Sequence, residues 1–546
     1  MITYIKHFSV KCCMVGILLY IPYFIQLDSL DSGYSGNQQI EIRKNGSDFK
    51  EYEGLYFITG GDLNNTNIKV DQKGGHLRIH LPKSRKCYLE FSGFGEIWYP
   101  ISEKPVYCDS VLFCRDSEGD IIEMNWIQNG NELNAVRLDP VVRKNDIRSV
   151  MHQPEIIGDG WMTASCQNEG IEPKNLAMIL KRIRAGTYKG IDGFVIVKNG
   201  KLVAEQYFDG FNRDSMHLTR SSFKSVVSIL VGIAIEDGII RLKDKIVDYL
   251  PEYDDCENWD ERKKDITIEH LLNMRAGYDC EEIFGLGPVH ELKMVMSHDW
   301  LKYCIDLPLI HNPGEQWSYC SNNVFLLSVI LANATGMSIL EFAEQRLFVP
   351  LEISTYSIED GCLSMKPRDL AKIGQLILND GNWKDTKIVS SKWIRESTRM
   401  HTIIPWSWTT EWASSKKNSN TSGYGYLWFQ QDFYIGKRKY RGVFAWGNGG
   451  QYIMVFPSLN LVVVFTGSNY SQTIQRAQLQ PFDILVRYIL PGVKDHRQIT
   501  FDQNRSVEKI MKNNEIMTDR EDRFRFGKLV EEYQSKRFSK EIEQPR

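Results

Sequence analysis

The chain has 546 residues, a length that predicts two or three domains. Its 66 basic and 69 acidic side chains leave a net charge of −3, which excludes the broad basic surface of a nucleic-acid-binding protein. Charged residues make up 25% and hydrophobic residues 42% of the chain, proportions typical of a globular protein. No C-x-x-C or H-E-x-x-H motif is present, so the sequence predicts no metal site.

The 11 cysteines cannot all pair within one chain. Cys256 and Cys280 lie on either side of a predicted helical stretch, and in an oxidising compartment they can pair with each other. The alternative is that both remain free thiols. The sequence leaves these two possibilities open.

Residues 1–27 have the pattern of a signal peptide or membrane anchor. Three residues (Lys6, His7 and Lys11) precede an apolar run over residues 12–25. At roughly 14 residues the run is shorter than the about 20 of a full membrane span, and no A-x-A cleavage site follows it. The basic residues before the run predict an extracytoplasmic protein, periplasmic or secreted. An uncleaved N-terminus that anchors the protein is the alternative to cleavage. A misassigned start codon or a buried segment is the alternative.

Residues 48–140 follow a polar linker and alternate at the period of strands. Segments such as 68–70, 76–81 and 111–113 are separated by turn pairs, including Gly74-Gly75. They predict a small antiparallel sheet or barrel of about six to eight strands. A structural or lid-like role is the simplest expectation for it, and an independent ligand site is the alternative.

Residues 171–495 begin with an amphipathic helix over 175–186 and a β-hairpin with Asn199-Gly200 at its turn. A helix from Ser222 is apolar almost all round and ends near Gly238, so it is expected to be buried. Ser221 and Lys224 form an S-x-x-K pair at its first turn, one above the other. A lysine held beside a serine hydroxyl can take its proton and make it nucleophilic. The same spacing occurs elsewhere, but only the Ser221 copy opens a long apolar helix (the others are Ser47/Lys50, Ser414/Lys417 and Ser506/Lys509).

Two later stretches can line a cleft beside Ser221. Tyr319 follows a Pro-Gly turn and precedes an apolar helix over 324–334, so its ring either points into a cleft or packs. The glycines Gly449 and Gly450 precede a strand that turns at 457–460 and returns over 461–466. Glycines there allow backbone to approach a ligand, and a simple bulge is the alternative.

The order of these stretches resembles the serine β-lactamase and penicillin-binding protein superfamily. The likeness is greatest to the class C-related branch, which holds esterases, D-aminopeptidases and 6-aminohexanoate-oligomer hydrolases. It covers about 320 residues and includes further matching segments at 242–253, 266–274, 369–376 and 424–428. The segment 121–130 resembles the end of the lipocalin-like module attached to such hydrolases, although that module usually follows the catalytic domain.

The resemblance implies a role for each matching residue. Ser221 would be the acylated nucleophile, and Lys224 and Tyr319 would share the acid and base work as a coupled pair. Since both have unperturbed pKa values near 10, one pKa would have to be lowered. The amide groups of Ser221 and Gln451 would form the oxyanion hole, and further residues would contact substrate (Ser321, Asn322, Asn448, Gly449 and Gly450).

Two departures from the family's motifs affect the expected substrate. The usual Y-x-N reads Tyr319-Cys320-Ser321, with Asn322 one position late, and the usual Lys or His of the third motif is Asn448. A neutral Asn448 offers no charge to a substrate carboxylate. We therefore expect a neutral ester or amide as substrate.

One further pattern is not catalytic. The segment 269–273 matches the E-x-x-L-N motif of class A β-lactamases, but here it precedes Tyr319. We therefore expect His270 to be structural. The charged tail over 496–546 predicts a solvated helix or a partly disordered segment.

The expected fold is α/β (α+β), an antiparallel sheet flanked by helices with an all-helical region within roughly residues 220–440 and a small all-β module before it. The expected function is hydrolysis of a small ester or amide through an acyl-enzyme, with no metal or organic cofactor and no nucleic-acid partner. The alternatives are a non-hydrolytic penicillin-recognising sensor and a D,D-peptidase or D-aminopeptidase. The loops 280–298 and 402–422 are expected to line the pocket.

Overall fold

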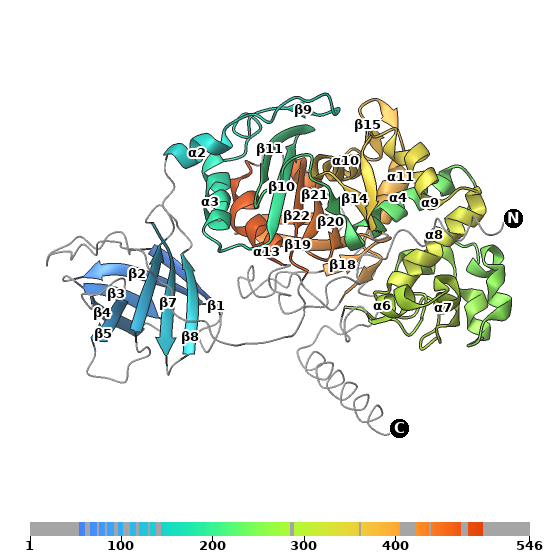
Figure 1. The fold of residues 1–546 in the computed structure, drawn as a ribbon, viewed down its shortest axis with the longest axis horizontal. Coiled ribbons are helices and arrows are strands. Elements are labelled where there is room, and N and C mark those ends of the chain that lie inside the picture. The colour runs from blue at the N-terminus through green and yellow to red at the C-terminus, as the bar shows by residue number, and fades with distance from the viewer. Residues whose placement is uncertain are drawn as a thin grey trace, which may run out of the picture.

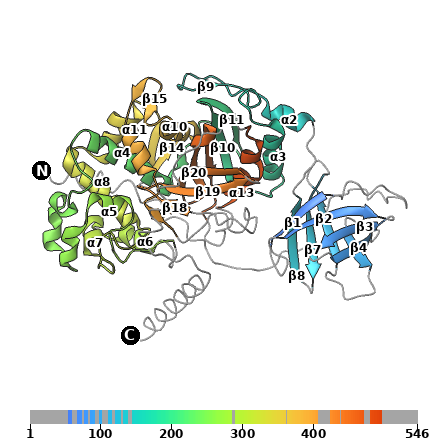
Figure 2. The same ribbon diagram turned by 180° about the vertical axis from the view of Figure 1, so that it is seen from behind.

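The computed structural model describes the strands between residues 54 and 137, residue 120, and residues 144–494 except for 284–288, 360–361, 405–421, 436–437 and 471–478. The N-terminal segment 1–27, the tail 496–546 and the other three S-x-x-K pairs lie outside these residues. The described chain forms two bodies with separate hydrophobic cores (Figures 1 and 2).

The first body is a closed antiparallel barrel, which confirms the expected all-β module. Buried side chains such as Ile68 and Val70, or Leu77 and Ile79, are two residues apart, because alternate side chains of a strand point to the same face. Closure pairs the first strand with the last and leaves no free edge. The strands are β1 (Gly54–Thr59), β2 (Thr66–Lys73), β3 (His76–Leu81), β4 (Arg85–Phe91), β5 (Ile97–Ile101), β6 (Ser110–Arg115), β7 (Ile121–Gln128) and β8 (Asn131–Arg137).

The second body is built on a nine-stranded sheet, antiparallel except where β9 pairs in parallel with β11. Its order is β17 (Thr402–Ile403), β18 (Ser422–Tyr424), β19 (Phe429–Ile435), β20 (Arg438–Gly447), β21 (Gln451–Phe456), β22 (Leu461–Gly467), β10 (Ile191–Lys198), β11 (Lys201–Tyr207) and β9 (Met162–Thr163). The predicted hairpin at Asn199-Gly200 is confirmed, with φ values of 53° and 75° at the two turn residues. Positive φ at both positions is what a two-residue hairpin turn requires.

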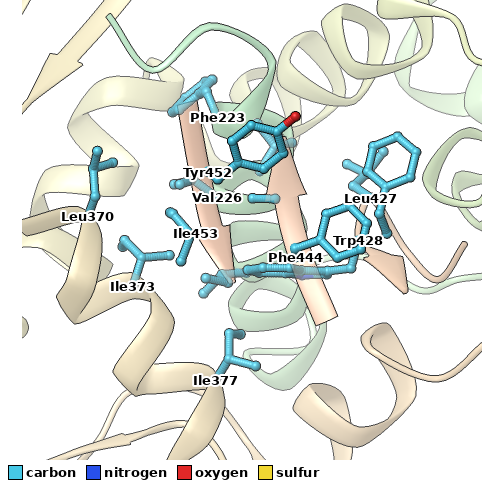
Figure 3. Packing of buried hydrophobic residues seen from close by; sticks show 14 of the residues in the cluster. Phe223, Val226, Leu370, Ile373, Ile377, Leu427, Trp428, Phe444, Tyr452 and Ile453 are labelled. Carbon is cyan, nitrogen blue, oxygen red and sulfur yellow. The ribbon is translucent and has the colours of Figure 1, made fainter. Parts of the chain in front are cut away.

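Helices cover both faces of this sheet. Helix α10 (Pro367–Leu378) packs on the face that carries Ile453, and Figure 3 shows Ile373 of α10 turned toward Ile453. On the opposite face, Phe482 of α13 (Gln480–Ile484) meets the ring of Tyr452 with centroids 5.2 Å apart. Since Tyr452 and Ile453 are neighbours on one strand, their side chains point to opposite faces, and both layers are buried. Also present are α2 (Lys144–Val150), α3 (Pro173–Arg184), α11 (Ser391–Ser397), α14 (Leu490–Gly492), and the short strands β12 (His217–Leu218), β13 (Tyr356–Glu359), β14 (Cys362–Met365), β15 (Asn382–Trp383) and β16 (Thr386–Lys387).

The expected helical region lies beside the sheet and centres on two apolar helices, α4 (Phe223–Glu236) and α8 (Ser321–Thr335). Around α8 pack α5 (Ile268–Leu272), α6 (Val289–Met296), α7 (Trp300–Asp306) and α9 (Ile339–Ala343). Helix α8 ends at Gly336, whose φ of 72° is the left-handed conformation that glycine favours. The fold class expected from the sequence is confirmed.

Two boundaries differ from the expectation. Val150 and Trp161 belong to the same core as the sheet, so this body begins before residue 171. Helix α8 begins at Ser321 rather than 324, because the polar residues of its first turn are buried instead of exposed. Among the described residues no single helix is long and apolar enough to cross a membrane, while one pair, Ser321–Thr335 with Ile339–Phe348, passes by length and composition but bends by 78°.

The close approach of α10 to the sheet makes a testable prediction at Gly374. A Cβ atom there would lie 2.5 Å from Cγ1 of Val462 and 2.9 Å from Cγ2 of Ile453. We expect Gly374→Ala to destabilise the fold by up to about 2 kcal/mol, because overpacking costs about 1–3 kcal/mol and the gain in helix propensity offsets about 1 kcal/mol. Urea unfolding measures this change.

A second substitution tests the cause. Val462→Ala removes the nearer methyl group, so the double variant should lose less stability than the two single changes together. Strict additivity would show that the contact with Val462 is not the source of the cost.

Candidate active site

Ser221 lies on a 3₁₀ turn, Arg220–Ser222, directly before α4. Arg220 has a φ of 49°, an uncommon left-handed conformation for a residue with a side chain. The preceding Thr219 is held by a hydrogen bond from its N–H to Leu363 O (2.8 Å), and its carbonyl lies so close to Gly447 of β20 that a Cβ there would approach it to 2.4 Å. The turn at Arg220–Ser222 therefore packs directly against β20, the strand that precedes the glycine-rich motif at 448–450.

Lys224 lies one helical turn after Ser221, as its spacing predicts. Its Nζ donates a hydrogen bond to Ser221 Oγ at 2.8 Å, and its side chain is buried. The Tyr319 hydroxyl interacts with both the Ser221 hydroxyl and the Lys224 ammonium group. The structure therefore brings Ser221 and Lys224 together with Tyr319, which lies 98 positions after Ser221 in the sequence.

The protonation of the pair follows from its surroundings. Burial lowers the pKa of Lys224, but the negative charges of ionised Tyr319, Glu291 and Glu282 outweigh burial and raise it. Burial also raises the pKa of Tyr319, and the Lys224 ammonium only partly opposes this. Neither pKa is lowered overall, contrary to the expectation from the motif, so both groups are protonated in the resting site at neutral pH.

Three aromatic rings pack around Tyr319. Its ring stacks on Phe429 with centroids 5.8 Å apart and lies 6.3 Å from Trp317 and 6.4 Å from Tyr424. Tyr319 itself is only 5% exposed. These contacts fix the ring, which leaves its hydroxyl at one position relative to Ser221.

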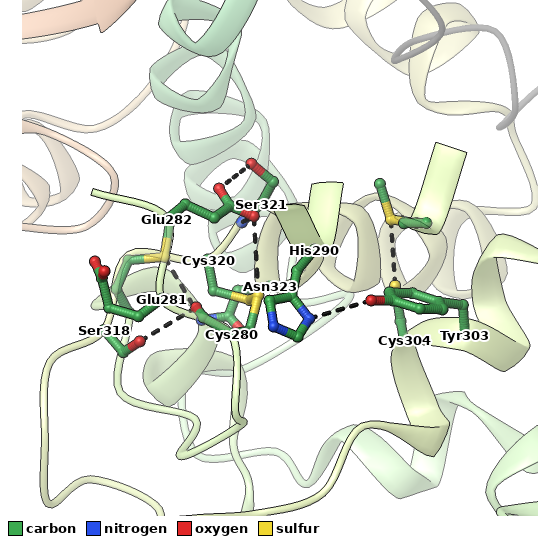
Figure 4. The surroundings of a disulfide bond; sticks show 12 residues. Cys280, Glu281, Glu282, His290, Tyr303, Cys304, Ser318, Cys320, Ser321 and Asn323 are labelled. Carbon is green, nitrogen blue, oxygen red and sulfur yellow. Dashed lines mark hydrogen bonds between the residues drawn. A yellow bond between two sulfur atoms is a disulfide. The ribbon is translucent and has the colours of Figure 1, made fainter. Parts of the chain in front are cut away.

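The cysteine of the second motif forms a disulfide. Cys320 is bonded to Cys280, which corrects the expected alternatives of a Cys256–Cys280 pair or free thiols. Cys256 instead accepts a hydrogen bond from the buried Lys263 ammonium at 3.0 Å. The alternative of a free thiol holds for Cys256 but not for Cys280. The pairing of two cysteines on either side of a predicted helix was wrong because the fold brings the loop that carries Cys280 against the start of α8 (Figure 4).

Glu282 is a residue of this region that the sequence did not single out. Its carboxylate accepts hydrogen bonds from Ser321 N (3.1 Å) and Ser321 Oγ (2.7 Å) (Figure 4). Cys280, Glu282 and Cys320 lie close enough to resemble a metal site, but their two sulfur atoms are bonded to each other and are not open to an ion. The signal in the sequence that could have indicated Glu282 was the pair of adjacent acidic residues at 281–282, within a predicted pocket loop.

The other residues expected to bind substrate occupy different environments. Ser321 is fully buried with its hydroxyl on Glu282, and Asn322 is fully buried with no hydrogen bond to its amide within the described part of the chain. Asn448 is exposed. Gly449 and Gly450 have φ values of 89° and 99°, and a Cβ on Gly449 would overlap the Tyr470 ring at 2.3 Å.

Gln451 opens β21 opposite Gly447. Its buried side chain bonds to the backbone of Gly467 through both Nε2 and Oε1, so the residue is firmly held. The structure places Gly447 against Thr219, and thus brings the start of β21 near the turn that carries Ser221. The role of the Gln451 amide in an oxyanion hole stays a prediction.

The E-x-x-L-N segment serves the fold. Glu269 accepts a hydrogen bond from Tyr426 Oη at 2.7 Å, and His270 Nδ1 accepts the Thr267 N–H at 3.3 Å at the start of α5. Burial lowers the pKa of His270, so the ring is neutral. Of the expected pocket loops, residues 284–288 and 405–421 lie outside the described residues.

Comparison with known proteins shows which family the chain belongs to. The Beta-lactamase family profile matches residues 184–481, which is more than half of the chain. The chain therefore belongs to the beta-lactamase family, whose fold supports hydrolases. It is 25% identical over 233 residues to the 6-aminohexanoate-dimer hydrolase of Paenarthrobacter ureafaciens, covering 37% of this chain and 56% of that protein.

Other known proteins are similar over different shares of the chain. Penicillin-binding protein 4* of Bacillus subtilis is 27% identical over 117 residues, covering 21% of this chain and 24% of that protein. A D-stereospecific amidohydrolase structure from Streptomyces has a TM-score of 0.41 and 15% identity, covering 55% of this chain and 95% of that one. A penicillin-binding protein homologue from Pyrococcus abyssi has a TM-score of 0.43 and 18% identity, covering 62% and 81%. The match to the 6-aminohexanoate-dimer hydrolase spans about half the length of that protein.

The Cys280–Cys320 bond can be tested by alkylation. When the protein is unfolded without reductant and treated with iodoacetamide, we expect the free cysteines to be modified and Cys280 and Cys320 to be protected, as read by peptide mass spectrometry. Among the described residues, the thiols expected to be modified are those of Cys166, Cys256 and Cys304. Modification of Cys280 before reduction would contradict the bond.

The same bond should stabilise the fold. It closes a loop of 40 residues, and removing such a cross-link by a Cys280→Ser/Cys320→Ser double substitution should cost about 3–4 kcal/mol. Cys256→Ser is the matched control, since that thiol forms no disulfide.

Proposed function

We propose that this protein is a serine hydrolase that cleaves a small ester or amide through an acyl-enzyme on Ser221. The observation that supports this most is the contact of the Lys224 ammonium and the Tyr319 hydroxyl with one serine hydroxyl. A serine held between two titratable groups has a route for its proton both when it attacks and when the leaving group departs. No metal or organic cofactor enters this scheme.

The proposed reaction has two halves. Ser221 Oγ attacks the carbonyl carbon while its proton passes to the Lys224–Tyr319 pair, and the oxyanion is stabilised by the amide groups of Ser221 and Gln451. The tetrahedral intermediate collapses, and the pair returns the proton to the departing alcohol or amine. Water then attacks the acyl-enzyme by the reverse route and frees the acid. Because both groups rest in protonated form, the Lys224–Tyr319 pair must release one proton to solvent before it can accept the proton of Ser221.

We propose a neutral substrate without a carboxylate beside the scissile bond. Asn448 carries no charge where the family usually has a cation, and the rings around Tyr319 offer an apolar wall. The names of the similar proteins, a 6-aminohexanoate-dimer hydrolase and a D-stereospecific amidohydrolase, are compatible with linear amides. D,D-Peptidase substrates and β-lactams carry a carboxylate and fit this site less well.

We also propose that the protein is exported and that residues 1–27 direct its export. The disulfide supports this, because such bonds persist in oxidising compartments and are rare in the cytosol.

The nucleophile can be tested with a p-nitrophenyl ester and a fluorophosphonate. Ser221→Ala should abolish turnover and labelling while the thermal unfolding temperature stays unchanged, since the hydroxyl is the attacking group. Matched controls are Ser414→Ala and Ser506→Ala, which remove the serine of other S-x-x-K pairs and should leave both activities intact.

Each result has a distinct meaning. Retained turnover in Ser221→Ala would contradict the proposed nucleophile. A stable wild-type adduct that forms with penicillin, without turnover of any ester or amide, would instead indicate the non-hydrolytic sensor.

The charge at position 448 tests the substrate class. Asn448→Lys introduces the missing cation at an exposed position, so acylation by benzylpenicillin should become faster by roughly tenfold, the effect of about 1.4 kcal/mol. Turnover of a neutral ester should change little. Intact-protein mass spectrometry follows the acylation, and Asn448→Gln is the neutral control. An equal change for both compounds would contradict charge as the cause.

A further inference from the structure

Glu282 is a buried carboxyl that the proposed acylation does not use. It lies on the loop after Cys280, is only 8% exposed, and faces the start of α8 (Figure 4). A buried carboxyl is costly unless hydrogen bonds or an opposite charge compensate it. Its partners therefore show what it does.

Three hydrogen bonds tie Glu282 to the residues on either side of the disulfide cysteine. Its backbone N–H donates to Tyr319 O at 3.0 Å. Its carboxylate accepts from Ser321 N at 3.1 Å and from Ser321 Oγ at 2.7 Å. Tyr319, whose hydroxyl contacts Ser221, is thus held through its own carbonyl and through the second residue after it.

The disulfide holds the same two segments together. Cys280 precedes Glu282 by two positions, Cys320 lies between Tyr319 and Ser321, and Ser318 Oγ donates to Cys280 O at 3.2 Å. The covalent bond keeps Glu282 within reach of Ser321. The disulfide can hold this motif because Cys320 is the middle residue of Tyr319-Cys320-Ser321.

Glu282 also takes the place of a helix cap. Cys320, the N-cap residue of α8, makes no capping hydrogen bond with its side chain, and the first N–H of the helix is instead bound by the Glu282 carboxylate. A carboxylate at this end interacts favourably with the helix dipole. The start of α8, and the tyrosine before it, are anchored by this contact.

The charges around Glu282 connect it to the catalytic pair. The groups that face it are Lys224 of α4, Tyr319 and Ser321 at the start of α8, Glu291 of α6, and Tyr303 and Cys304 of α7. Burial, with the charge of Glu291, raises the pKa of Glu282 to about 8, although Lys224 and Ser321 act in the opposite direction. In return, ionised Glu282 raises the pKa values of both Lys224 and Tyr319.

We propose that Glu282 is a positioning residue of the active site, which holds Tyr319 against Ser221 through its hydrogen bonds to the Tyr319 carbonyl and to Ser321. The disulfide keeps it in place. This inference rests on the proposed acylation of Ser221.

The test compares two substitutions of Glu282 by the rate of fluorophosphonate labelling across about pH 7–11, because the pKa values of Lys224 and Tyr319 are both raised above their ordinary values near 10. Glu282→Gln keeps an acceptor for the Ser321 N–H but removes the charge, so labelling should survive while its ascending limb moves to lower pH. The sign follows because the negative charge of Glu282 raises the pKa values of the pair, and its loss lowers them. Glu282→Ala also removes the contacts, and labelling should fall on the order of 100-fold.

Glu281→Gln is the matched control. The neighbouring carboxylate accepts the N–H of Ile283 at 2.9 Å, and its replacement should leave the pH profile unchanged. A purely structural Glu282 would alter stability and overall rate but would not move the limb in Glu282→Gln.

The outcomes separate this inference from the proposed function. If wild-type Ser221 is labelled but the profile of Glu282→Gln coincides with that of wild type, or Glu282→Ala is labelled at the wild-type rate, the role of Glu282 is wrong and the hydrolase proposal stands. If wild-type Ser221 is not labelled at any pH, both are wrong. If Glu282→Ala does not fold, the pH profile of Glu282→Gln decides the question.

Discussion

The contact between a buried lysine and the serine one turn before it is the constraint on which the site depends. Lys224 Nζ donates to Ser221 Oγ at 2.8 Å inside a helix that is apolar on all sides. A cation in such a place needs compensation, since burial alone favours its neutral form. Tyr319, Glu282 and Glu291 raise the pKa of Lys224 when they are ionised, and each comes from a part of the chain at or near the start of α6 or α8.

That compensation explains why the second motif is so strongly anchored. Tyr319 must hold its hydroxyl near Ser221, yet it lies in a loop, where backbone is usually mobile. Aromatic rings fix one side of the tyrosine, while the Cys280–Cys320 bond and Glu282 fix its backbone.

Much of the fold was predictable because it depends on neighbours in sequence. Asn199-Gly200 permits the positive φ values of a tight turn, and alternating apolar residues gave the barrel strands. The S-x-x-K spacing placed Ser221 and Lys224 one turn apart. Contacts between distant segments were harder to predict. The possible Cys256–Cys280 pair, inferred from the positions of the two cysteines around a predicted helix, was wrong because Cys280 bonds to Cys320.

By itself, the sequence determined the family, the elements around Ser221 and the missing charge at Asn448, since local spacing and side-chain chemistry are written in the chain. Only the tertiary structure decided that Cys320 bonds to Cys280, that Glu282 caps α8 and faces Lys224, and that neither the pKa of Lys224 nor that of Tyr319 is lowered. The physical reason is that disulfides, buried hydrogen bonds and pKa shifts depend on distances and burial between segments far apart in sequence.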